Sequence, residues 1–361
     1  MPRFNKATIK DVAARAAVST TTVSLFISGR LTVCSPETAE RIRQAVAELN
    51  YTPNSLTRGL RQKHLMTLGV CLSSPLDPDV AYGASFFESL WRGIIVEADL
   101  SEYSLLHYPI GIRDGGNHRA FLDGRVDGIL LHDHQNERAA NLVDAGMPTV
   151  LLTRSLSVPE GCGSAFADDR ATARLALDYL WEQGHRRIAH IAGPVGGRAQ
   201  GMRRPHVRTV MWEDDIAVQR LEGYAARMQE RGAWDPALVS YAQAWSAPQA
   251  EEALSAWRSS ENPPTAIFCA NDAQAVDLLA AARRLGVRVP EQLSIMSVDD
   301  SALARESSPP LTGVKAPVDE IGRAGVRALL AIIAGEPLEA CRIEVPVTQL
   351  VVRGSAASLG R

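Results

Sequence analysis

Apolar residues near the N-terminus are spaced as on one face of a short helix. Ile9, Val12, Ala13 and Ala16 stand at i, i+3, i+4 and i+7, which is the period of an α-helix. Thr8, just before them, is a suitable N-cap residue. The spacing therefore predicts a short amphipathic helix that begins after Thr8.

A second short helix is expected after a tight break at Ala17-Val18. Ser19 can cap it, and Val23 and Phe26 can pack inward. The outward positions would then be Thr20, Thr21, Ser24 and Leu25. This helix would present hydroxyl groups and one leucine to its surroundings.

A third helix is predicted to begin at Ser35-Pro36, where a cap residue precedes proline at the first helical position. Ile42, Val46 and Leu49, at i, i+4 and i+7, can close a small core over the first two helices. Two short helices joined by a brief turn are typical of the helix-turn-helix, whose second helix enters the major groove of DNA. The pattern would also suit another three-helix domain.

From residue 65 onward, short apolar runs alternate with amphipathic helices. The expected strands are 65–72, 104–108, 126–131, 148–153, 187–192, 264–269 and 293–298. The expected helices are 86–99, 139–145, 171–183, 217–231, 249–259, 272–285 and 318–335. This alternation predicts α/β lobes in which helices cover both faces of parallel sheets. Ligands of such sheets bind beyond the carboxyl ends of the strands, so two facing lobes would form a cleft.

Charge divides the chain at the same place. Residues 1–64 carry ten Lys or Arg and four Asp or Glu, a net charge of +6, whereas the whole chain carries −3. A small basic module of this kind most often faces nucleic acid. No apolar run reaches the roughly 18 residues that cross a bilayer, and residues 1–10 lack the apolar region of a secretory signal. We therefore expect a cytoplasmic protein that binds double-stranded DNA.

Patterns of cysteine, histidine and glycine do not predict a metal or cofactor. The five cysteines are far apart and show no C-x-x-C spacing. His132-Asp133-His134 has no accompanying ligand pattern, which favours a loop cluster over a metal site. Gly193-Pro194-Val195-Gly196-Gly197 lacks the G-x-G-x-x-G order, and no G-x-S-x-G, H-E-x-x-H or Walker sequence is present. We expect no catalytic residues and no cofactor.

Seven short segments form an ordered pattern in the first 61 residues. They are Asp11-Val12-Ala13, Val18-Ser19, Thr22-Val23-Ser24, Ser35-Pro36-Glu37-Thr38, Leu49-Asn50-Tyr51, Pro53-Asn54 and Arg58-Gly59-Leu60. This pattern resembles the DNA-binding region of the LacI/GalR family of bacterial transcription repressors. The resemblance implies a helix-turn-helix domain over residues 1–52, a hinge over 53–64 and an effector-binding and dimerisation domain over 65–361. The DNA-binding residues that it implies are Thr8, Ser19, Thr20, Thr21, Thr22, Leu25, Ser28, Arg30, Thr38, Asn54, Arg58 and Leu60.

Three residues depart from the family's pattern in this region. Ala17 replaces a frequent Gly, Ser28 a common Asn, and Leu25 a common Arg. Arg is the side chain best suited to a bidentate contact with guanine. Leu25 could instead touch a thymine methyl group, so we expect an atypical operator at that position.

The hinge segment carries an apolar residue that the resemblance places in DNA. It implies that residues 54–61 form a helix only on DNA, pair with the dimer mate and insert Leu60 into the minor groove, where an apolar wedge kinks the duplex. Gly59 disfavours the free helix by about 1 kcal/mol relative to Ala. An ordinary flexible linker is the alternative.

The resemblance continues through the body of the chain. Matching segments include Gly184-His185-Arg186-Arg187-Ile188-Ala189, Arg220-Leu221-Glu222-Gly223-Tyr224, Ala270-Asn271-Asp272 and Ser297-Val298-Asp299-Asp300. The likeness implies two Rossmann-like parallel-sheet lobes, as in periplasmic sugar-binding proteins. The N-lobe would hold about 65–165 and 296–325, and the C-lobe about 166–295 and 326–361. The implied effector-binding residues are Ser73, Phe87, Arg154, Arg220, Trp245, Asn271 and Asp299.

A guanidinium, a carboxylate and an amide beside aromatic rings suit a hydroxylated ring such as a sugar or a nucleoside. Arg220 and Asp299 could instead form a plain surface ion pair, and Trp245 could be a core residue. Phe86, next to Phe87, could be the inward ring. Thr153 stands where the family commonly has Asp or Asn.

The segment between Pro194 and Arg220 is longer than is usual in the family. Its part at 198–215 could be a mobile solvated loop, or it could close over the cleft and supply Arg to an anionic effector. No leucine heptads follow Arg353, so a homodimer is expected rather than a tail-linked tetramer. The expected function is a transcriptional repressor whose affinity for a near-palindromic operator is controlled by a small-molecule effector. A solute-binding protein and a sugar- or nucleoside-processing enzyme are the alternatives, and the basic first module argues against both.

Overall fold

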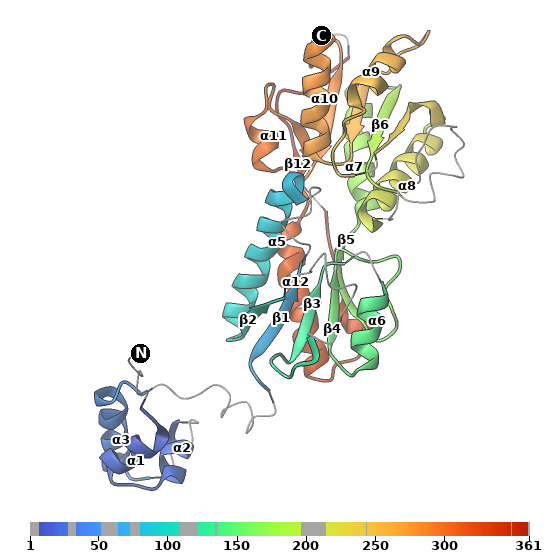
Figure 1. Ribbon diagram of the computed structural model, residues 1–361. Helices are drawn as coiled ribbons and strands as arrows, with labels where there is room; N and C mark the ends of the chain where they lie inside the picture. Colours follow the sequence, from blue (N-terminus) through green and yellow to red (C-terminus); the bar gives the residue numbers. More distant parts are fainter. Residues whose placement is uncertain are drawn as a thin grey trace. The chain divides into compact units, whose positions relative to one another are not determined.

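The computed structural model divides the chain into two compact units, Met1–Met66 and Thr67–Arg361 (Figure 1). The residues it describes are 7–27, 34–51, 64–72, 80–108, 121–133, 136–195, 214–242, 244–347 and 349–359. Some residues singled out above lie outside these ranges. They are Ser28, Arg30, Asn54, Arg58, Leu60, Ser73, His134 and the segment 196–213.

The first unit consists of three helices, α1 (Ile9–Ala16), α2 (Thr20–Ile27) and α3 (Pro36–Glu48). Their bounds agree with the three helices predicted from apolar spacing. Val12 from α1, Val23 from α2 and Ile42 from α3 are fully buried where the helices meet. Phe26, Val46 and Leu49 pack around them as partly buried residues, so the predicted core is confirmed.

The turn between α1 and α2 is tight because Ala17 adopts a left-handed conformation, with φ of +54°. Its N–H donates to the Ala14 carbonyl at 3.3 Å, and the Val18 N–H donates to the Ala13 carbonyl at 3.0 Å. A left-handed conformation costs a non-glycine residue about 1 kcal/mol. Ala17 therefore adopts this conformation at a free-energy cost that the glycine frequent at this position would avoid.

The second unit contains two six-stranded sheets. The first has the order β11-β5-β4-β3-β1-β2 and is parallel throughout. Its strands are β1 (Thr67–Cys71), β2 (Ser104–His107), β3 (Gly128–Leu131), β4 (Thr149–Leu152), β5 (Gly163–Ala167) and β11 (Arg342–Val345). The second has the order β12-β10-β9-β8-β6-β7 and is parallel except for the β10–β12 pair. Its strands are β6 (Ile188–Ala192), β7 (Val239–Tyr241), β8 (Ala266–Cys269), β9 (Ser294–Val298), β10 (Thr312–Val314) and β12 (Leu350–Val351).

Helices cover both faces of each sheet, as the alternating pattern predicted. The helices of this unit are α5 (Val80–Leu100), α6 (Asn136–Asp144), α7 (Asp169–Glu182), α8 (Asp215–Glu230), α9 (Ala250–Arg258), α10 (Asp272–Arg284), α11 (Ala302–Glu306) and α12 (Val318–Ile333), with short 3₁₀ turns η4 (Pro236–Leu238) and η5 (Leu338–Cys341). In the first lobe, α5 and α12 share one core with the sheet and α6 shares another (Figure 1). In the second lobe, α7 and α8 pack on one face and α9 and α10 on the other.

The points at which the chain passes between the lobes differ from two of those expected. The first passage lies between β5 and α7, near the expected residue 165. The other two lie between β10 and α12 and between β11 and β12, so the expected passages near residues 296 and 325 are wrong. The reason is pairing: β9 and β10 pair with each other inside the second sheet, while β11 pairs with β5 of the first.

Two glycines let α5 and α12 approach each other closely. A Cβ atom on Gly93 would lie 1.9 Å from the Asp319 carbonyl oxygen, and one on Gly322 would lie 2.4 Å from the Leu90 carbonyl oxygen. The two helices therefore touch backbone to backbone at this crossing. No helix in the described part of the chain is long and apolar enough to cross a bilayer.

Candidate functional site

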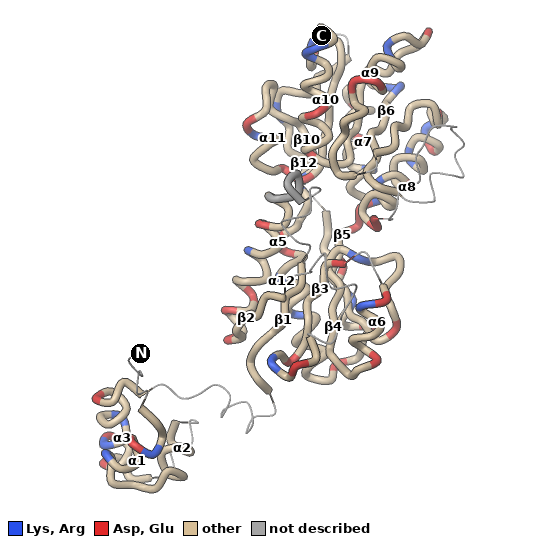
Figure 2. Tube along the Cα trace, in the orientation of Figure 1, with Lys and Arg blue, Asp and Glu red and all other residues tan. Residues whose placement is uncertain are grey.

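Helix α2 begins after a cap in which the hydroxyl groups of Ser19 and Thr22 are hydrogen-bonded. The Ser19 Oγ accepts from the Thr22 N–H at 3.0 Å and lies 2.8 Å from the Thr22 Oγ1. Thr20 and Thr21 remain exposed, and Leu25 is half-buried. No residue of α2 is charged, so the helix is tan along its length in Figure 2.

Two other threonines assigned to DNA contact by resemblance are also engaged at helix starts. Thr8 donates from both its N–H and its Oγ1 to Asp11 Oδ2, each at 2.7 Å, at the start of α1. The Thr38 N–H donates to the Ser35 Oγ at 3.3 Å, and Arg41 donates to the Thr38 Oγ1 at 3.2 Å. The local geometry explains these residue types without a ligand.

In the second lobe, Arg220 of α8 is the centre of a buried polar cluster. Its Nε lies 2.7 Å from Asp169 Oδ1, and its Nη1 also donates to the Ala270 carbonyl. Its Nη1 lies 3.9 Å from Asp299 Oδ1, and its guanidinium lies 6.0 Å from the centroid of the Trp245 ring. Only 4% of the Arg220 side chain is exposed. The alternative of a plain surface ion pair is therefore wrong for Arg220.

The two carboxylates beside Arg220 differ in how closely they contact it. Burial raises the pKa of Asp169, and the Arg220 guanidinium offsets part of that shift. Burial raises the pKa of Asp299 to about 8, and Arg220, 3.9 Å away, offsets part of that shift. Asp299 is thus a weakly paired carboxyl at a strand end, with a fifth of its side chain exposed. It can accept a hydrogen bond from a ligand hydroxyl, or donate one when protonated.

Asp299 sits on a backbone turn with positive φ. The φ angles of Asp299 and Asp300 are +115° and +61°, and such values are rare for residues other than glycine. Asp272 holds the turn: its carboxylate accepts from the Ser297 hydroxyl at 2.6 Å and from the Ser301 N–H at 2.7 Å. Strain of this kind persists where surrounding contacts over-determine the backbone, often at functional sites.

Asn271 and Trp245 are joined to each other. The Asn271 Oδ1 accepts from the Gln274 N–H at 2.8 Å and caps α10, while its Nδ2 donates to the Trp245 carbonyl at 2.9 Å. The Trp245 ring is half-buried and covers Gly193, where a Cβ atom would come within 2.9 Å of it. Asn271 therefore positions the loop that carries the Trp245 ring.

The first lobe contributes a group of aromatic side chains. Phe87 makes edge contacts with Phe86 at 5.3 Å and with His132 at 5.1 Å between ring centroids, and both Phe rings are half-buried. Asp133 pairs with Arg138 at 2.6 Å. Within the described residues, no group of three or more His, Cys, Asp or Glu side chains is placed to hold a metal ion.

Arg154 is buried and its guanidinium connects the two lobes. It donates to Asn136 Oδ1 at 2.9 Å in the first lobe and lies 3.2 Å from Asp215 Oδ2 at the start of α8 in the second. The same Asp215 oxygen accepts from the N–H groups of Ser155 and Leu156 at 3.1 and 3.0 Å. This places Arg154 in an interlobe ion pair, separate from the Arg220 cluster.

Two family models match the chain. The one described as "Bacterial regulatory proteins, lacI family" matches residues 8–54, which include α1, α2 and α3, and the one described as "Periplasmic binding protein-like domain" matches residues 177–356. The transcriptional regulator CelR of Thermobifida fusca is 33% identical over 364 residues, which cover 98% of this chain and 100% of CelR. The chain belongs to the lacI family.

Other lacI-family proteins align over similar lengths. The ribose operon repressor of Escherichia coli is 30% identical over 97% of this chain and 100% of that repressor. A solved structure of a CelR–cellobiose complex is 30% identical, with a TM-score of 0.66 over 97% of this chain and 100% of that one. The resemblance and the two-lobed fold predicted from the sequence are thereby confirmed, and this lacI-family chain is a DNA-binding transcriptional regulator.

Residues that support the Arg220 cluster were not predicted from the sequence of this lacI-family protein. Asp169 follows Asp168 at the first lobe passage, and Asp272 follows Asn271 at the start of α10. Each of these acidic residues directly follows a helix cap, and no local pattern assigns it a second role. Only the tertiary contacts reveal that Asp169 pairs with Arg220 and that Asp272 holds the turn at Asp299.

Proposed function

We propose that this protein is a cytoplasmic repressor that binds a near-palindromic operator as a homodimer and changes its affinity when a hydroxylated ring binds at the Arg220 cluster, in a cleft between the two lobes. Dimeric helix-turn-helix proteins place two recognition helices in successive major grooves, which matches an operator of two half-sites. The relative solved with cellobiose supports a sugar as the effector class. A nucleoside is the close chemical alternative, and no catalytic step is assigned.

The observation that carries the effector proposal is the buried Arg220 cluster. Arg220 offers N–H donors and the Trp245 ring provides an aromatic face. Asp299 offers a carboxyl group that lies 3.9 Å from Arg220, beyond hydrogen-bond distance. A ring with several hydroxyl groups can use all three, because its hydroxyls both donate and accept while its C–H faces stack on an aromatic ring. Phe87 would complete the site from the first lobe, with Asn271 positioning the Trp245 loop.

For DNA, we assign base contacts to the exposed side of α2. Thr20 and Thr21 are exposed and Leu25 is half-buried. Hydroxyl groups contact several bases without strong preference, and apolar groups contact the thymine methyl. The engaged Ser19 and Thr22 hydroxyls are assigned to holding the start of α2, where helix N–H groups face phosphate.

The test begins with selection of bound duplexes from a random pool by the full-length protein. The dissociation constant of a selected duplex is then measured by fluorescence anisotropy with and without each member of a panel of sugars and nucleosides. One class should change it by about 5- to 150-fold, the usual range for coupling between two sites. The response should be lost in R220K, while binding to the duplex without effector is kept. A response that persists in R220K would remove the effector assignment, and failure of selection would remove the DNA assignment.

A further inference from the structure

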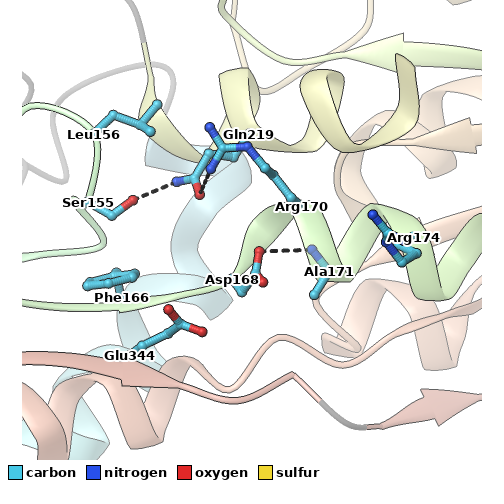
Figure 3. Close-up of a pocket in the computed structure, with 9 residues that line it drawn as sticks. All are labelled: Ser155, Leu156, Phe166, Asp168, Arg170, Ala171, Arg174, Gln219 and Glu344. Carbon is cyan, nitrogen blue, oxygen red and sulfur yellow. Dashed lines mark hydrogen bonds between the residues drawn. The ribbon is translucent and has the colours of Figure 1, made fainter. Parts of the chain in front are cut away.

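A cavity of about 570 Å³ lies where the chain first passes from one lobe to the other (Figure 3). Phe166 and Glu344 reach it from the paired strands β5 and β11 of the first lobe. Asp168 and Arg170, at the start of α7, and Gln219 of α8 reach it from the second lobe. None of the residues proposed above to bind the effector lines it.

This cavity and the Arg220 cluster are built on neighbouring residues of the same two helices. Asp168 and Gln219 line the cavity, while the next residues along the chain, Asp169 and Arg220, form the ion pair of the cluster. The Gln219 Nε2 donates to the Ser155 Oγ at 2.9 Å, a bond between the lobes that forms part of the cavity wall. An occupant that reaches from Glu344 to Asp168 therefore contacts both lobes.

The cationic side chains of the cavity already have acidic partners outside it. Arg170 lies 2.5 Å from Glu222, and Arg174 lies 3.5 Å from Glu230, both on α8. Arg170 also donates to the Gln219 Oε1 at 3.2 Å. Each cationic side chain of the cavity therefore has an acidic partner on α8, and Glu230 is shared with Arg227, which lies 2.6 Å from it.

The acidic side chains of the cavity form no ion pair within the described part of the chain. The Asp168 carboxylate accepts one hydrogen bond, from the Ala171 N–H at 2.9 Å, and so caps α7. Glu344 is exposed, and its carboxylate has neither an ion pair nor a hydrogen bond among the described residues. In Figure 3 the carboxylates of Glu344 and Asp168 flank the same space, beside the half-buried Phe166 ring. The cavity thus combines an aromatic side chain with two carboxylates that form no ion pair among the described residues, one of which, Asp168, caps α7.

We propose that this cavity is a second ligand site, specific for a small organic cation that carries a primary ammonium group on a short aliphatic chain. The ammonium donates to the Glu344 and Asp168 carboxylates and is attracted to the face of the Phe166 ring. The aliphatic part packs against Leu156 at the opposite wall. Because the occupant contacts both lobes, it binds best to one lobe arrangement and shifts the protein toward it.

The test is isothermal titration calorimetry of the full-length protein without DNA, with 1,4-diaminobutane as the probe and 1,4-butanediol as its neutral counterpart. The diamine should bind saturably with one molecule per chain, and the diol should not bind. E344Q should weaken diamine binding by about tenfold or more, since a hydrogen-bonded charge is lost. Glu344 is exposed, so E344Q should fold normally. The matched control is E339Q, a change of an exposed glutamate in η5 that does not line the cavity.

Absence of saturable heat would overturn the proposal, as would equal weakening by E339Q and E344Q, because that would indicate general attraction of amines to an acidic protein. Equal binding of the diol would also overturn it. Operator binding by E344Q, measured separately, should match that of the wild type. If the diamine does not bind, the assignments of α2 to DNA and of Arg220 to the effector are unaffected, because the operator-binding assay tests them separately.

Discussion

Removing one partner of the buried Asp169–Arg220 ion pair should destabilise the second lobe more than removing one partner of an exposed ion pair. Replacing Asp169 by Asn removes the closest acidic partner of the buried Arg220 guanidinium and leaves the Ala270 carbonyl and, at 3.9 Å, the Asp299 carboxyl group. Breaking a buried ion pair by removing one partner typically destabilises a protein by about 3–5 kcal/mol. Because Asp299 remains nearby, we expect D169N to lose about 3 kcal/mol, at the lower end of that range. Urea unfolding followed by circular dichroism measures the loss.

The same two helices provide a matched control. Asp178 of α7 pairs with Arg227 of α8 at 2.5 Å and with Arg231 at 3.1 Å, but 30%, 20% and 32% of these three side chains are exposed. Exposed pairs contribute about 0–1 kcal/mol, so D178N should lose less than about 1 kcal/mol. If D169N cost no more than D178N, burial would not govern the strength of the Arg220 cluster, and the reasoning would be refuted.

Three further predictions test other parts of the structure. The pKa of Asp299 is about 8 in the folded protein against about 3.9 in an unfolded chain. The protonated Asp299 carboxyl therefore adds to the free energy of unfolding; this addition is complete below pH 4 and is lost as the pH rises toward 8. D299N does not lose stability in this way. The difference between its free energy of unfolding and that of the wild type should therefore rise between pH 5 and pH 8 in urea titrations. A difference that does not change with pH would contradict the pKa shift. G322A should destabilise the first lobe by about 1–3 kcal/mol in thermal unfolding, because the new Cβ would meet the Leu90 carbonyl of α5 at 2.4 Å; unchanged stability would mean that the helices separate freely. If Leu25 covers a thymine methyl, replacing that thymine by uracil in a selected operator should weaken wild-type binding about fourfold, as expected for one buried methyl group. The same replacement should not change the binding of L25A. Equal sensitivity of both proteins would exclude the contact.

Local patterns predicted most of the elements because the apolar period and the caps act within a few residues. Ser19 caps α2 and Ser35 caps α3, as expected from their positions before the helices. The strands missed from the sequence include β5, β10 and β12. β10 and β12 have only three and two residues, too few to show a period, and β5 reads Gly-Ser-Ala-Phe-Ala, which carries little apolar bulk.

The lobe boundaries and the supporting shell of the site depend on contacts between distant residues. The pairing of β11 with β5 joins positions that are more than 170 residues apart, so no local pattern indicates it. Arg220, Asp299 and Trp245 were predicted to lie together, and the structure brings them to one cluster. Arg154 is expected from the resemblance to face the effector, but its guanidinium is directed at Asp215. No local sequence feature near Arg154 or near Asp215 predicts this ion pair.

The central claim is that ligand binding at the Arg220 cluster governs DNA binding by α2. The most direct test is the dissociation constant of a selected operator duplex at low salt, measured for the wild type and R220K with and without the effector found in the panel. We predict a change of about 5- to 150-fold in the wild type and no change in R220K. A full-length protein that binds no selected duplex at low salt, or whose affinity responds equally in both proteins, would contradict the account.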